Sequence, residues 1–117
     1  MFIHFCKSKI AHGRITEAQL YYEGSITIDE SLLKASNIIP GERVEVLNVN
    51  NGSRLETYAL AGRAGSGQIC LNGPAARTGF VGDQLIILSY ALVEAQAAKK
   101  LKTKVVYLDD KNRIKKK

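Results

Sequence analysis

The sequence predicts a small, mainly β fold with short helices. Three observations lead to this prediction: several short runs rich in β-branched and aromatic residues, a strong hairpin signal at Asn51-Gly52, and little helical periodicity. Many short strands with few helices are typical of a small β-barrel. A chain of 117 residues has the size of one domain, so we expect residues 1–117 to form a single domain.

The predicted strands combine apolar and β-branched residues and are bounded by turn signals. They are residues 2–9, 25–28, 43–48, 55–60, 68–71, 84–90 and 104–108. Asn51-Gly52 joins the third and fourth of these as a type I′ hairpin, because both central positions of that turn favour positive φ. Residues 109–112 are predicted to turn the chain after the last strand.

Three segments favour helix. Residues 16–19 resemble a capping box, which predicts a short helical turn. Asp29 is a candidate N-cap for a helix through residues 32–35 that ends before Pro40-Gly41. Residues 92–100 are rich in helix-forming side chains and predict a further helix.

The net charge of +6 is concentrated at the C-terminal end of the chain. From Lys99 onward there are nine basic and two acidic residues, whereas residues 1–98 carry eight basic and nine acidic residues. The basic tail, residues 111–117, is typical of a solvated end, and no aromatic residue follows Tyr107 to stack on bases. We therefore expect no nucleic-acid partner, although a non-catalytic β-barrel that binds nucleic acid through this tail is an alternative.

No stretch approaches the ~18 to 20 apolar residues of a membrane span, and the N-terminus lacks the pattern of a signal peptide. We expect a cytoplasmic protein that does not bind membranes. Cys6 and Cys70 form no metal-ligand pattern, and a disulfide between them is not expected in a reducing cytosol.

The bond between Gly24 and Ser25 lies between two segments that are predicted to be ordered. The Ser25 hydroxyl can attack the carbonyl of Gly24, and glycine allows the strained backbone that this attack needs. The peptide then becomes an ester, and elimination followed by hydrolysis leaves a pyruvoyl group at a new N-terminus. A Gly-Ser pair alone is more typical of an ordinary turn, so the surrounding motifs must decide between these interpretations.

The surrounding motifs are Lys9, Thr16-Glu17-Ala18, Tyr22-Glu23-Gly24-Ser25-Ile26-Thr27-Ile28-Asp29, Val49-Asn50-Asn51-Gly52-Ser53-Arg54, Glu56-Thr57-Tyr58-Ala59, Asn72-Gly73, Ala75-Ala76-Arg77 and Gly82-Asp83. Together they resemble the bacterial, pyruvoyl-dependent aspartate 1-decarboxylase family, in family order and spacing, over about residues 1–110. Several separated motifs in register are far more specific than any one of them.

The resemblance implies a six-stranded double-psi β-barrel that assembles as a homotetramer with active sites between subunits. It implies a carboxy-lyase that converts L-aspartate to β-alanine and CO₂, which supplies a precursor of pantothenate and coenzyme A. The chain would cleave itself into residues 1–24 and 25–117, and a pyruvoyl group derived from Ser25 would form a Schiff base with the substrate. Neither a metal nor pyridoxal phosphate is expected, and parts of the family use a helper protein for maturation.

The same resemblance assigns roles to individual residues. Ser25 gives rise to the cofactor, and Thr57 assists the cleavage between Gly24 and Ser25. Tyr58 donates a proton to the carbanion, which suits a phenol whose ordinary pKa is about 10. Arg54 holds a substrate carboxylate, since a guanidinium matches it bidentately, and Lys9 adds a second cation. The other expected substrate contacts are Thr57, Asn72, Gly73, Pro74 and Ala75.

Each assignment has a structural alternative: a surface tyrosine on a strand, a solvated arginine, an ordinary surface lysine, and a plain turn after residues 68–71. Strand alternation also places Arg54 and Tyr58 on one face and Thr57 on the other. Either a bulge intervenes, or the two faces serve different parts of a site between subunits.

Two positions depart from the family pattern. His12 stands one residue later than the family's usual histidine, which on a strand reverses its side chain, so no role is transferred to it. Pro74 stands where alanine is expected and offers no backbone N–H. A pyruvoyl enzyme for a different amino acid, and a homologue that folds without cleaving, are therefore alternatives, although Arg54 favours an acidic substrate.

Overall fold

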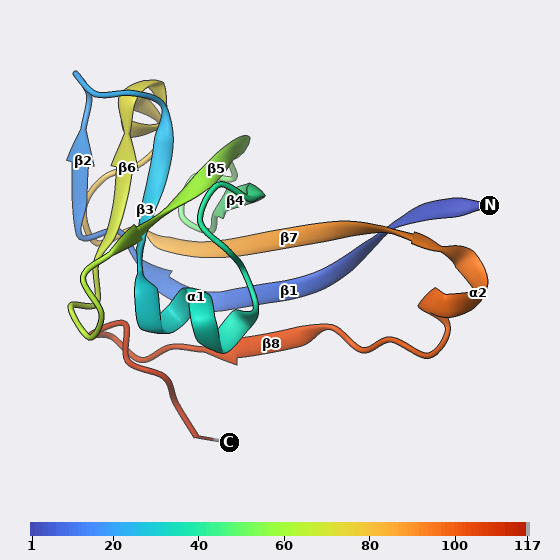
Figure 1. The fold of residues 1–117 in the computed structure, drawn as a ribbon. Helices are drawn as coiled ribbons and strands as arrows, with labels where there is room; N and C mark the ends of the chain where they lie inside the picture. Colours follow the sequence, from blue (N-terminus) through green and yellow to red (C-terminus); the bar gives the residue numbers. More distant parts are fainter. Residues whose placement is uncertain (117) are drawn as a thin grey trace.

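A computed structural model describes residues 1–116 and has a mainly β fold with short helices, as the sequence predicts (Figure 1). The elements are β1 (Phe2–Arg14), β2 (Glu17–Gln19), β3 (Ser25–Asp29), α1 (Glu30–Ser36), β4 (Arg43–Asn48), β5 (Arg54–Gly62), β6 (Ile69–Asn72), η1 (Gly73–Thr78), β7 (Gln84–Glu94), α2 (Ala95–Ala98) and β8 (Lys104–Tyr107). Lys117, the last residue of the basic tail, lies outside the described residues.

The strands pair in the order β2-β6-β3-β5-β4-β7-β1-β8. Eight strands take part, where six were expected, because the short strands β2 and β8 add to the two ends of this order. β1 and β7 form a long antiparallel ribbon from Arg14↔Gln84 to Phe2↔Glu94, and Figure 1 shows it projecting toward the N-terminus and α2. The parallel pair β3 and β5 places the start of β3 beside the middle of β5.

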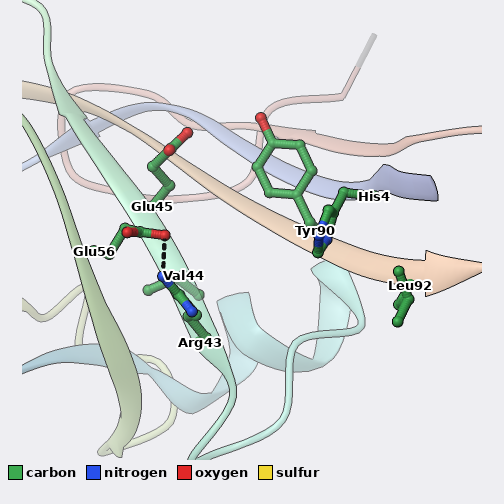
Figure 2. Close-up of a pocket in the computed structure, with 7 residues that line it drawn as sticks. All are labelled: His4, Arg43, Val44, Glu45, Glu56, Tyr90 and Leu92. Atoms are coloured by element: carbon green, nitrogen blue, oxygen red, sulfur yellow. Dashed lines mark hydrogen bonds and ion pairs between the residues drawn. The ribbon is translucent and has the colours of Figure 1, made fainter. Parts of the chain in front are cut away.

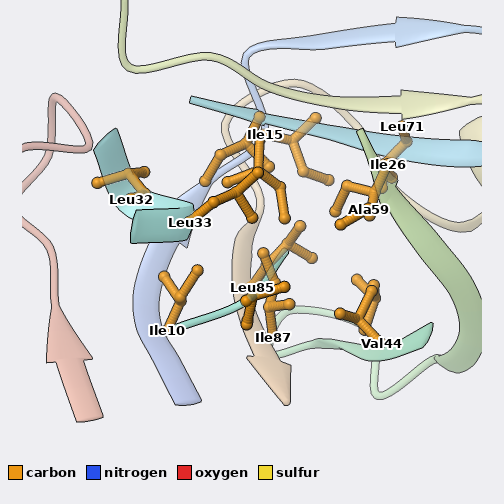
Figure 3. Close-up of a cluster of buried hydrophobic side chains, with 14 of the residues drawn as sticks. Ile10, Ile15, Ile26, Leu32, Leu33, Val44, Ala59, Leu71, Leu85 and Ile87 are labelled. Atoms are coloured by element: carbon orange, nitrogen blue, oxygen red, sulfur yellow. The ribbon is translucent and has the colours of Figure 1, made fainter. Parts of the chain in front are cut away.

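The core is a cluster of aliphatic side chains contributed by strands β1 and β3 to β8 together with α1 (Figure 3). Alternation along the strands selects these residues: Val44 and Val46 in β4 and Leu85 and Ile87 in β7 are each at most 1% exposed. The opposite faces of β4, β5 and the outer part of β7 are left more exposed, and that outer face carries several of the predicted site residues.

Three sequence predictions differ from the structure. Residues 17–19 form β2 instead of a helical turn, because they pair with β6 and the Thr16 hydroxyl donates to the carbonyl of Ile69 at 3.0 Å. The hairpin after β4 is not type I′, since only Gly52 of its central pair has positive φ, at 77°. The predicted helix over 92–100 shortens to α2, because β7 continues to pair with β1 as far as Glu94.

Asp29 ends β3 and starts α1, as predicted from its capping potential. The side chain is 2% exposed, and its carboxylate accepts hydrogen bonds from the N–H and hydroxyl of Ser31 and from the N–H groups of Gly65 and Gly67, at 2.7 to 3.0 Å. Burial alone would raise the pKa of Asp29, but these hydrogen bonds together hold that pKa below its ordinary value. One carboxylate therefore fixes the end of β3, the helix and the loop before β6.

Within residues 1–116, no helix has the length and apolar character needed to cross a bilayer. Cys6 and Cys70 are both free thiols.

We predict that Asp29→Ala lowers the free energy of unfolding by about 3 kcal/mol, because a helix cap is lost and buried N–H groups lose their acceptor. The depressed pKa means that this stabilisation is present above the unfolded-state pKa and is lost as the pH falls through the folded-state pKa. Urea denaturation at neutral and acid pH should therefore show a gap between variant and wild type that narrows in acid.

The matched control is Glu30→Ala, which removes an exposed carboxylate whose only described ion pair is with Lys34 at 3.6 Å. This control should change the free energy of unfolding by less than about 0.5 kcal/mol. An equal loss in both variants would contradict the structural role of Asp29.

Candidate functional site

The chain segments around Gly24-Ser25 and Asn72-Gly73 cross at very short range. Ser25 at the start of β3 is paired with Asn72 at the end of β6. Gly73 follows with a φ of 66°, and a Cβ added to it would lie 2.6 Å from the carbonyl oxygen of Tyr22 and 2.9 Å from Cα of Gly24. Gly73 is therefore required both by its backbone conformation and by the segment that passes beside it.

Ser25 is fully buried, and its hydroxyl is held by two contacts. Oγ accepts a hydrogen bond from Nδ2 of Asn72 at 3.0 Å and donates to the carbonyl of Glu23 at 3.3 Å. The same Nδ2 donates to Oγ1 of Thr27 at 2.9 Å, and Oδ1 of Asn72 faces the thiol of Cys70 at 3.2 Å. Burial raises the pKa of Cys70, so its thiol stays protonated and can donate.

A surface cavity of about 390 Å³ opens beside Gly24. It brings together four of the predicted site residues, because parallel pairing of Ile26 with Ala59 carries Gly24 to the level of Thr57. The lining residues are Gly24, Leu55, Glu56, Thr57, Pro74, Ala75 and Thr78. The space is sufficient for a small amino acid, and it is bounded by the Gly24 side of the peptide at which cleavage is predicted.

Lys9, Arg54 and Tyr58 lie outside this cavity lining. Alternation along β5 turns Arg54 and Tyr58 to the face opposite Leu55 and Thr57. The structure therefore has these residues on two faces of the strand, which is one of the two alternatives drawn from the sequence. Nη1 of Arg54 forms an ion pair with Oε1 of Glu45 at 2.6 Å, and the phenol-bearing side chain of Tyr58 is 38% exposed.

Pairing across the sheet places Lys9 on the same outer face as Arg54. Lys9 is opposite Leu88, Leu88 is opposite Glu45, and Glu45 in turn binds Arg54. The predicted site therefore consists of a cleavage group at the Gly24 cavity and an outer-face group made of Lys9, Arg54 and Tyr58.

The outer face is hollowed between β4, β5, β7 and β1 (Figure 2). This hollow has a volume of about 500 Å³ and is lined by His4, Arg43, Val44, Glu45, Glu56, Tyr90 and Leu92. Arg43 and Glu56 form an ion pair across it, drawn as the dashed line in Figure 2. Burial first and the nearby carboxylate of Glu45 second raise the pKa of Tyr90, so its phenol remains protonated.

His12 occupies a bulge of β1 with a φ of 68°. Its ring stacks on Tyr107 with 5.9 Å between centroids, and Nδ1 lies 2.8 Å from Nε2 of Gln84. These contacts direct His12 to a different hollow from the one at Gly24. Pro74 is accommodated in the first turn of η1, where its missing N–H costs no helical hydrogen bond.

Sequence reasoning gave no role in this region to four residues that the structure places there: Thr27, Cys70, Glu56 and Thr78. Thr27 could have been found, because on a predicted strand it is two residues from Ser25 and so shares its face. Among residues 1–116, no group of three or more His, Cys, Asp or Glu side chains is arranged to hold a metal ion.

Comparison with known proteins shows which family the sequence matches. The family model described as Aspartate decarboxylase matches residues 1–115. A protein of Carboxydothermus hydrogenoformans named Aspartate 1-decarboxylase is 54% identical over 97% of this chain and 90% of its own length. A protein of the same name from Dehalococcoides mccartyi is 56% identical over 92% of this chain and 87% of its own length. Another, from Cytophaga hutchinsonii, is 50% identical over 97% of this chain and 99% of its own length.

We predict that Gly73→Ala destabilises the fold more than Gly82→Ala does. Both glycines have positive φ, but a Cβ at Gly82 would meet nothing within 4 Å, whereas one at Gly73 would collide with the Tyr22–Gly24 segment. Gly82→Ala should lower the free energy of unfolding by about 1 kcal/mol from backbone strain alone, and Gly73→Ala by at least about 2 kcal/mol. Urea denaturation measures both, and equal losses would show that the close crossing does not constrain the fold.

Proposed function

The chain belongs to the aspartate decarboxylase family, and from this premise we propose that it converts L-aspartate to β-alanine and CO₂ with a pyruvoyl group derived from its own Ser25. The observation that carries the proposal is the position of the Gly24–Ser25 peptide. It lies at the edge of a cavity of about 390 Å³, with Oγ of Ser25 bound by Asn72 and with Thr57 across from Gly24.

The residues present fit the formation of such a group. Oγ of Ser25 bonds to the carbonyl carbon of Gly24, the C–N bond breaks, and the freed amine takes up the proton lost by the hydroxyl, which gives an ester. Loss of the Ser25 α-proton then expels the carboxylate of Gly24 and leaves a dehydroalanine. Water adds to that residue and ammonia leaves, so that a ketone stands at the new N-terminus. We assign to Thr57, which lines the same cavity, the donation of a hydrogen bond to the Gly24 oxygen while that oxygen carries negative charge.

When present, this carbonyl group supplies the electron sink that stabilises the carbanion left by departing CO₂. The side chains of the chain supply binding and proton transfer. Arg54 binds a carboxylate of aspartate through its paired N–H groups. Its ion pair with Glu45 is broken when the substrate carboxylate takes the place of the Glu45 carboxylate. Tyr58 returns a proton from its phenol to the substrate carbon as a general acid.

The separation of the two groups of site residues supports a site completed between subunits. In one copy, Lys9, Arg54 and Tyr58 face outward from the sheet, while Gly24 and Thr57 line a cavity that these three residues do not line. We propose that the outer-face group of one copy meets the Gly24 cavity of another within a homotetramer. Exposed apolar side chains on and beside this face, among them Phe2, Tyr90 and Leu92, supply a surface for such contact.

A coenzyme-free assay of β-alanine production from L-aspartate tests the proposed function. The wild-type protein should form β-alanine with no added pyridoxal phosphate, and Ser25→Ala should abolish the reaction while remaining folded. Ser66→Ala is the matched control, since Ser66 lies in an exposed loop, and it should keep wild-type activity. Activity retained by Ser25→Ala would contradict the assignment, and product from another amino acid but not from aspartate would correct the substrate.

We predict that Arg54→Ala raises KM for aspartate about 10- to 100-fold. A hydrogen bond to a charged group contributes ~1.5 to 3 kcal/mol, and each 1.4 kcal/mol is a factor of about ten in affinity. The control is Arg43→Ala, which removes an arginine on the same face whose ion pair is with Glu56 and should change KM by less than about twofold. Steady-state kinetics of matured protein would refute the role of Arg54 if both variants had the same KM.

A further inference from the structure

We propose that Thr27 is a positioning residue for self-cleavage, whose hydroxyl holds the Asn72 carboxamide with its N–H directed at Oγ of Ser25. This inference rests on the proposed function, because it concerns how the pyruvoyl precursor is processed. It gives a role to a residue that takes no direct part in bond making or breaking.

The geometry of the three side chains is that of one donor shared between two acceptors. Ser25 and Thr27 project from the same face of β3, and Asn72 is paired with Ser25 on the adjacent β6. Nδ2 of Asn72 carries two hydrogens and donates to Oγ of Ser25 at 3.0 Å and to Oγ1 of Thr27 at 2.9 Å. Asn72 is 3% exposed and Ser25 is fully buried, so bulk water offers the amide little competition.

Thr27 and Cys70 together decide which way the amide points. Rotating the Asn72 carboxamide by half a turn would direct its N–H groups at the Cys70 thiol, which is itself a donor. Oδ1 now faces that thiol at 3.2 Å, and burial keeps the thiol protonated. The orientation found here gives every polar atom of the carboxamide a partner.

This orientation matters most when Oγ of Ser25 leaves. After the acyl shift, Oγ is the ester oxygen, and elimination breaks its bond to Cβ of Ser25 while negative charge develops on the departing carboxylate. An N–H group of Asn72 that donates to the former Oγ, now an oxygen of the departing carboxylate, stabilises the developing charge. Without Thr27 the carboxamide can turn away, and elimination slows relative to the acyl shift.

The experiment follows cleavage of freshly purified precursor by intact mass over time. Thr27→Val keeps the shape of the side chain but removes the hydroxyl, and it should slow cleavage about tenfold, the effect of one hydrogen bond. Thr27→Ser restores the hydroxyl and should cleave within about twofold of wild type. Thr103→Val is the control, because that hydroxyl donates to the carbonyl of Cys6 elsewhere in the fold, and it should cleave at the wild-type rate.

A second measurement separates positioning from general destabilisation. In Thr27→Val the ester should accumulate, so hydroxylamine should split more of the uncleaved chain at Gly24 than it does in wild type. If Thr27→Val does not fold, Cys70→Ala and Cys70→Ser test the other side of the amide, and only Cys70→Ala should be slow. If the wild-type chain cleaves and Thr27→Val cleaves at the same rate, the inference about Thr27 is overturned but the proposed function is not. If the wild-type chain never cleaves, both are overturned.

Discussion

The close crossing of Gly24-Ser25 with Asn72-Gly73 is the constraint on which the site depends. Two backbones approach so nearly that a Cβ at Gly73 would lie within 3 Å of three backbone atoms of the neighbouring segment. The approach places the Ser25 hydroxyl in contact with the Asn72 amide and leaves Gly24 at the cavity edge. A buried serine and an accessible glycine in adjacent positions follow from this one crossing.

The sheet topology divides the predicted site residues between the cavity beside Gly24 and the outer face of the sheet. Parallel pairing of β3 with β5 brings Thr57 to the cavity, and the period of two along β5 sends Arg54 and Tyr58 to the outer face. In the proposed mechanism, cleavage and substrate binding draw on two faces of one strand, and a second subunit would bring these faces together. Asp29 stabilises this arrangement at the other end of β3, because its carboxylate joins the end of β3 to α1 and to the loop before β6.

Local signals in the sequence were sufficient for part of this structure. The strand at Ser25 and the cap at Asp29 were predicted from strand-forming and capping residues along the chain, whereas Asn72 and Gly73 were assigned to the same site as Ser25 only through the family resemblance. The strand β2 was missed because its partner β6 is some fifty residues away, and a capping pattern at Thr16 looked helical. The turn at Asn51 was mistyped because Oδ1 of Asn48 accepts from the N–H groups of Asn50 and Asn51 and selects a different geometry. The division of the site into two faces was one of two alternatives drawn from alternation, but the register that aligns Lys9 with Glu45, the ion-pair partner of Arg54, could come only from the structure.

Intact mass spectrometry of the purified, assembled protein tests the central claim most directly, namely that the chain turns its own Ser25 into the carbonyl group used for decarboxylation. The account predicts a fragment of 24 residues and a fragment of 93 residues, the larger beginning with a ketone where an amine would otherwise stand. An unbroken chain of 117 residues that nonetheless decarboxylates aspartate without added coenzyme would contradict it.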